Sequence, residues 1–130
     1  MKADLAALRG RILGAYLWGS HVTGGAHARS DVDVCLVGGP GRGAQDVLRD
    51  AWTRVDGHGI AYDFRAFEEM PLFLQGEVLD SGILLFAEDE PRLSEYLRPI
   101  RKLWEDQAAR RHRTPEDVER ILAARRQALG

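Results

Sequence analysis

The feature that most constrains this chain is a pair of aspartates two residues apart within an apolar run. Asp31 and Asp33 alternate with Val32 and Val34, and the apolar run continues to Val37. This alternation predicts a β-strand, on which residues two apart point to the same face. Two neighbouring carboxylates repel each other, and a divalent cation relieves that repulsion. Because carboxylate oxygens are hard ligands, the pair predicts a Mg²⁺ site.

A short turn lies about ten residues before the aspartates, and this spacing is part of the sequence pattern that the two features form together. Gly19 and Ser20 follow Trp18, which ends a short predicted strand. Because Gly19 has no side chain, backbone N–H groups of the turn can approach an anion, and Ser20 adds a hydroxyl. His21 comes next and could contact the same phosphate or be a plain loop residue. The sequence therefore predicts a phosphate-binding turn beside the metal site.

A third acidic residue lies in a second strand-like run at residues 60–67. Asp63 and Arg65 would share the outward face of that strand, and the aromatic residues beside them would face inward. If the two strands are neighbours, Asp63 lies beside Asp31 and Asp33. Three carboxylates can hold two metal ions roughly 3.5–4 Å apart and act on both oxygens of an in-line phosphoryl displacement.

The segment from Trp18 to Val34 resembles the nucleotidyltransferase superfamily that includes the palm of DNA polymerase beta. That pattern is a hydrophobic residue, Gly-Ser or Gly-Gly, roughly ten residues, and then Asp-hydrophobic-Asp-hydrophobic. Asp63 and the Gly-led apolar strand at 82–86 further resemble the minimal nucleotidyltransferases, the MNT proteins of bacteria and archaea. The resemblance covers about residues 1–90. It implies a polymerase beta palm-like fold and transfer of AMP from ATP to an acceptor hydroxyl.

The resemblance also implies roles for the motif residues. Two Mg²⁺ ions are expected, with Mn²⁺ as the alternative, and ATP is the expected substrate. The expected catalytic and metal-binding residues are Asp31, Asp33 and Asp63. The expected nucleotide-binding residues are Gly19, Ser20, His21 and Arg65.

One departure from the family pattern affects the phosphate contacts. Minimal family members often carry Arg one and three residues after the Ser, where this chain has His21 and Thr23. The triphosphate charge must then be met by metal, by backbone N–H groups, or by another cation such as Arg29 or Arg65.

The biological role follows from the same resemblance. Minimal nucleotidyltransferases are often paired with a helical HEPN toxin, an RNase, which they neutralise by binding and by adding AMP to a Tyr. An antitoxin with a HEPN-type partner is therefore the leading interpretation. One alternative is a non-catalytic binding module that inhibits a partner protein. Another is a nucleotidyltransferase that acts on a small hydroxylated molecule. The single-domain size of the chain argues against this second alternative.

Composition and charge limit the possible partners and cellular location of the protein. The 130 residues carry a net charge of −2, which argues against direct, general nucleic-acid binding. Cys35 is the single cysteine and fits a reducing compartment. No apolar run approaches the roughly 20 residues that span a bilayer. These features predict a cytoplasmic protein that does not insert in a membrane.

The expected architecture is α/β (α+β), with a short mixed sheet, helices on one side and a C-terminal helical extension. The nucleotidyltransferase domain would span residues 1–90, with the helices of 91–130 packed on the same domain. Expected strands lie at 15–18, 31–37, 59–67 and 83–86, and expected helices at 3–14, 44–55, 68–79, 91–111 and from 115 onward.

The glycine-rich segment 38–43 resembles a dinucleotide-binding fingerprint, because Gly39-Pro40-Gly41-Arg42-Gly43-Ala44 fits its spacing. Pro40 and Arg42 would crowd a pyrophosphate, and that fingerprint leaves the paired aspartates unexplained. A flexible loop over or beside the carboxylate site is expected instead.

Overall fold

The computed structural model describes residues 2–19, 32–57, 59–111 and 115–129. Its centre is a mixed four-stranded sheet in the order β3-β2-β1-β4. The antiparallel partners of β1 are β2 and β4, and β2 pairs in parallel with β3. The strands are β1 (Gly14–Trp18), β2 (Val32–Val37), β3 (Tyr62–Ala66) and β4 (Ile83–Ala87). The predicted mixed sheet is confirmed.

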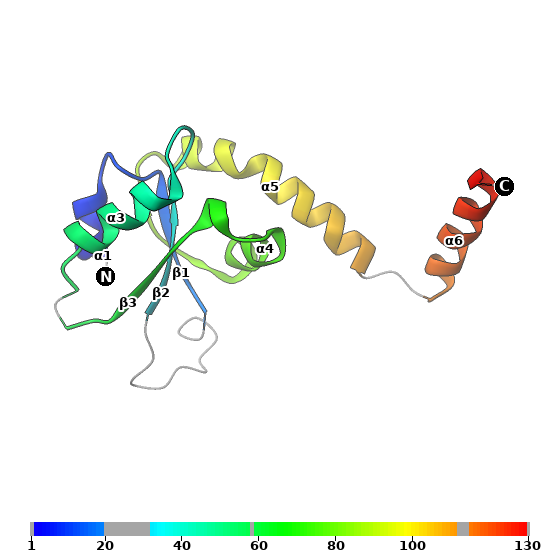
Figure 1. Ribbon diagram of the computed structural model, residues 1–130, viewed down its shortest axis with the longest axis horizontal. Helices are drawn as coiled ribbons and strands as arrows, with labels where there is room; N and C mark the ends of the chain where they lie inside the picture. The colour runs from blue at the N-terminus through cyan, green and yellow to red at the C-terminus, as the bar shows by residue number, and fades with distance from the viewer. Residues whose placement is uncertain (1, 20–31, 58, 112–114, 130) are drawn as a thin grey trace.

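Helical segments connect and follow the strands (Figure 1). They are α1 (Lys2–Leu5), the 3-10 turn η1 (Ala6–Leu8), α3 (Ala44–Arg54), the 3-10 turn η2 (Phe67–Glu69), α4 (Leu72–Ser81), α5 (Glu90–Arg111) and α6 (Pro115–Leu129). None of the helices in the described ranges is long and apolar enough to cross a membrane.

The N-terminal helix is shorter than expected. Helical structure ends at Leu8 rather than near residue 14, because Gly10 adopts a φ of 78° that a right-handed helix does not allow. Leu13 then donates its backbone N–H to the carbonyl of Val37 at 2.8 Å, so the chain has already joined the sheet. The prediction of a helix through residue 14 is therefore wrong.

The fold class is as predicted, but helices cover both faces of the sheet rather than one (Figure 1). Val34 and Leu36 pack in a core cluster with Val47 of α3, whereas Cys35 packs on the other face with Leu97 of α5. The cause is in β2 itself, because its second half is apolar on both faces and each face must be covered.

The second helical layer covers only one end of its face. Cys35 and Val37 are buried beneath α4 and α5, whereas Asp33, on the same face of β2, is only half-buried. Among the described residues, the fully buried apolar side chains of this layer therefore lie at the far end of the face, and Asp33 is left only partly covered.

The beginning of the C-terminal extension packs on the domain through Leu93, Leu97 and Trp104. The Trp104 ring lies directly against Gly76 of α4, and its Nε1–H donates to Asp80 Oδ2 at 2.6 Å. Trp104 is thus a core residue rather than part of a partner surface. Beyond it α5 is largely exposed, and Figure 1 shows α6 lying past the end of α5, away from the sheet.

Candidate active site

The sheet register brings two of the predicted carboxylates together. Asp33 of β2 is directly opposite Asp63 of the parallel strand β3, and Trp18 at the end of β1 is opposite Asp33 on its other side. The apolar residues that flank each aspartate are buried against α1 and α3, so the alternation turns both carboxylates to the other face. The strands β2 and β3 are therefore neighbours, as the prediction that Asp63 lies beside Asp33 required.

The turn after β1 approaches the Asp33 carboxylate closely. Gly19 has a φ of 92°, and a Cβ atom built on it would lie 2.5 Å from Asp33 Oδ2. The positive φ therefore favours glycine here, and any Cβ at this position would displace the Asp33 carboxylate. The sequence placed this turn next to the carboxylates, and the structure brings its first residue into contact with one of them.

Arg65 lies two residues after Asp63 and shares its face of β3, as expected. Its Nη2 is 3.4 Å from Asp63 Oδ2, and the arginine side chain is 53% exposed. An ion pair this exposed contributes little to stability. The guanidinium can therefore turn to a ligand phosphate at small cost.

Several predicted site residues, namely Asp31, Ser20 and His21, lie outside the described residues, as do Thr23 and Arg29. Within the described ranges, no group of three His, Cys, Asp or Glu side chains is placed to hold a metal ion. Asp33 and Asp63 supply two adjacent hard oxygen donors, which fit Mg²⁺. Asp31, two residues before Asp33, is the expected third donor.

A pocket of about 380 Å³ adjoins Asp63 and was not predicted from the sequence. Asp63 and Arg65 line one side, and the segment Glu69 to Pro71 lines another. It lies along β3, which is an edge strand of the sheet. One indication of this pocket was present in the sequence. Residues 69–71 follow β3 after only a few residues, so they had to lie near that strand.

The glycine-rich loop, in contrast, is far from this site. Val37, at its start, pairs with Gly14 at the beginning of β1, whereas Asp33 pairs with Trp18 at the end of β1. The loop therefore leaves the opposite end of the sheet, and the expectation that it covers or flanks the carboxylates is wrong. The direction of β2 decides this, since the strand runs from the carboxylates to the loop.

A small mixed sheet with a glycine turn beside paired carboxylates defines a nucleotidyl-transfer palm. The family model described as "Polymerase beta, Nucleotidyltransferase" matches residues 3–91, more than half of the chain. The chain therefore belongs to the polymerase beta nucleotidyltransferase family, and it is a nucleotidyltransferase.

A curated relative comes from Methanocaldococcus jannaschii and is named "Putative protein adenylyltransferase MJ1547". It is 35% identical over 101 residues, which cover 77% of this chain and 75% of that protein. This similarity supports the family assignment along most of both chains.

Solved structures share the fold. A toxin-antitoxin crystal structure with AMP-PNP superposes with a TM-score of 0.60 at 18% identity, covering 85% of this chain and 92% of that one. A mutant of the toxin-antitoxin MntA-HpeT gives a TM-score of 0.61 at 16% identity, with 85% and 93% covered. At these identities the likeness concerns the fold.

Proposed function

We propose that this chain transfers AMP from ATP to a hydroxyl group of a partner protein, with Asp31, Asp33 and Asp63 as the metal-binding and catalytic residues. The observation that carries the proposal is the register of β2 and β3, which sets Asp33 opposite Asp63 on the same face of the sheet. The relative named as a protein adenylyltransferase favours a protein acceptor.

The site residues would have two roles, which are to neutralise phosphate charge and to position the reacting groups. When bound, Mg²⁺ would neutralise phosphate charge and favour the ionised acceptor hydroxyl. The turn at Gly19 and Ser20, with His21, would hold the phosphates, and Arg65 would supply a further cation. The pocket beside Asp63 would receive the acceptor side chain, which needs to approach the phosphate in line.

The proposed partner is a HEPN-type toxin, and the proposed acceptor is one of its Tyr residues. Structures that share the fold are toxin-antitoxin complexes, and one of them contains AMP-PNP. The extension at 91–130 carries ten Lys and Arg against six Asp and Glu, and the part of α5 after Trp104 is largely exposed. We propose that α6 and this distal part of α5 contact the partner.

The test is transfer of radioactive AMP to the co-purified partner, followed by mass spectrometry. Asp33→Asn should abolish the label and leave the association intact, because it removes a metal ligand at a half-buried surface position. Asp46→Asn, on exposed α3, is the matched control and should transfer AMP normally. EDTA should abolish transfer by the wild-type protein and by Asp46→Asn.

Two outcomes would contradict the proposal. Undiminished labelling by Asp33→Asn would show that these carboxylates do not hold the metal. A bound, inhibited and unmodified partner would instead support the non-catalytic binding module.

A further inference from the structure

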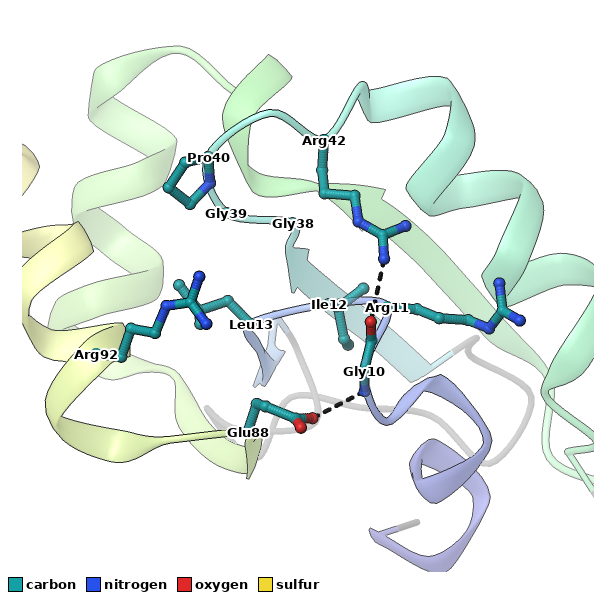
Figure 2. Close-up of a pocket in the computed structure, with 10 residues that line it drawn as sticks. All are labelled: Gly10, Arg11, Ile12, Leu13, Gly38, Gly39, Pro40, Arg42, Glu88 and Arg92. Carbon is teal, nitrogen blue, oxygen red and sulfur yellow. Dashed lines mark hydrogen bonds between the residues drawn. The ribbon is translucent and has the colours of Figure 1, made fainter.

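A second pocket lies at the other end of the sheet from the carboxylates (Figure 2). Its volume is about 180 Å³. Three segments meet around it: residues 10–13 before β1, residues 38–42 after β2, and the β4–α5 junction with Glu88 and Arg92. None of these residues contributes to the site at Asp33 and Asp63.

Arginine side chains dominate the polar groups of this pocket. Arg42 donates from Nη2 to the carbonyl of Gly10 at 3.1 Å, and its Nη1 is 3.8 Å from Asp50 Oδ2. Arg11 and Arg54 approach the other oxygen of Asp50, each at 3.6 Å. One carboxylate therefore faces three guanidinium groups and cannot neutralise them.

The fourth arginine stands across the pocket. Figure 2 shows Arg92 and Arg42 on opposite sides, with Gly38 and Gly39 between them. Among the described residues, no carboxylate lies within ion-pair distance of the Arg92 guanidinium. Glu88 also lines the pocket, where its Oε2 accepts the N–H of Gly10 at 2.9 Å. Carboxylates also stand at these walls, since Asp89 Oδ1 accepts the N–H of Arg92 at 3.2 Å and Glu68 lies against Gly38 and Gly39. The pocket is therefore distinguished by the placement of Arg42 and Arg92 rather than by its net charge.

The wall that carries Arg42 is held in place by a single carboxylate. Glu68 Oε1 accepts the N–H groups of Gly38 at 2.8 Å and Gly39 at 3.1 Å, and it also accepts the Tyr96 hydroxyl at 3.3 Å. These bonds tie the loop to α5, the helix that bears Arg92. The segments that carry Arg42 and Arg92 are thus connected by hydrogen bonds. This connection lowers the entropic cost of ordering the two side chains around a ligand.

We propose that this pocket binds a phosphate dianion, either inorganic phosphate or the phosphate group of a small monoester. A phosphate group carries about −1.5 to −2 charges at neutral pH, and Arg42 and Arg92 would approach it from opposite sides of the pocket. Guanidinium groups bind phosphate through paired N–H donors. The volume corresponds to roughly six waters at ~30 Å³ each, enough for a phosphate with a small organic group.

The test is titration of the ¹⁵N-labelled protein in EDTA with inorganic phosphate and, separately, glycerol 3-phosphate. Amide signals of Gly10, Gly39 and Gly41 should shift, while that of Gly19 at the carboxylate site reports on binding elsewhere. The ligand that binds more tightly identifies the source of the phosphate. Sodium chloride at equal ionic strength should not reproduce the shifts.

Variants sharpen the test. Arg42→Gln and Arg92→Gln should each weaken phosphate binding about tenfold or more, the expected effect of losing a hydrogen bond to a charged group. Arg98→Gln is the matched control, because Arg98 is on the same helix, is 73% exposed and pairs with Glu95. Glu88→Gln keeps an acceptor for Gly10 but removes a negative charge, so binding of a group with a charge of about −1.5 to −2 should tighten roughly six- to tenfold for a separation of about 6 Å in water-like screening.

Equal affinity in Arg92→Gln and Arg98→Gln would overturn the proposal, as would weaker binding in Glu88→Gln. Shifts confined to Gly19 would also overturn it. Thermal unfolding of each variant separates lost binding from lost structure. If Arg42→Gln unfolds, Arg92→Gln decides the question, because removing the Arg92 guanidinium breaks no ion pair among the described residues.

Discussion

Replacing Gly19 by alanine tests whether the turn positions the Asp33 carboxylate. The added Cβ would lie 2.5 Å from Asp33 Oδ2 and 3.3 Å from its Cγ, so the carboxylate must move. The displaced atoms are the end of a flexible side chain rather than backbone. Their movement shifts a proposed metal ligand within the site.

The matched control is Gly59→Ala. Gly59 has a φ of 90°, close to the 92° of Gly19, but a Cβ built on it meets nothing within 4 Å. Both substitutions should lower the free energy of unfolding by about 1–2 kcal/mol, because an L-residue at positive φ brings Cβ close to the backbone. The strain is therefore common to both variants, and the contact with Asp33 belongs to Gly19→Ala alone.

Two measurements separate these effects. Urea unfolding should give similar losses of stability in the two variants. Titration calorimetry with ATP and Mg²⁺ should show binding weakened about tenfold or more in Gly19→Ala, since small misplacements of a site group have large effects. Wild-type ATP affinity in Gly19→Ala would refute the reasoning. A stability loss in Gly19→Ala far above that of Gly59→Ala would show that the carboxylate is not free to move.

Three further predictions follow from the structure. Arg65→Ala should reduce turnover more than Arg49→Ala, a similarly exposed and weakly paired control; equal activities would mean that other groups hold the phosphates. Gly76→Ala should lower the unfolding free energy by about 1–3 kcal/mol in urea titrations, because its methyl group would collide with the Trp104 ring; unchanged stability would contradict that packing. Burial raises the pKa of Tyr96 from 10.0 to about 12, so its stabilising contribution is present below pH 10 and is lost as the pH rises to 12. Tyr96→Phe should therefore reduce the loss of stability across that interval, and an unchanged pH profile would argue against the shift.

Much of the site was visible in local sequence patterns. Alternation around Asp33 and around Asp63 predicted two strands, each with its aspartate on the face opposite the apolar residues, and the structure has both. The Gly-Ser spacing indicated the turn before them. Such patterns are readable because the side-chain period of a strand is set by its backbone geometry. The catalytic and metal-binding roles assigned to these residues stay predictions.

Local patterns failed where a distant contact decided the outcome. Apolar spacing favoured a helix through residue 14, but pairing of Leu13 with Val37 and the positive φ of Gly10 ended it at Leu8. The glycine-rich loop was expected beside the carboxylates, yet β2 carries it to the other end of the sheet.

The sequence alone indicated the strands that carry Asp33 and Asp63 and the family to which the chain belongs, because these depend on residue type and short spacing. Tertiary structure alone decided that Asp33 lies opposite Asp63, since a parallel register depends on how both strands pack against the helices. It likewise assembled Arg11, Arg42 and Arg92 from three separate segments. No local period links residues so far apart in the chain, and only the folded sheet brings their charges together.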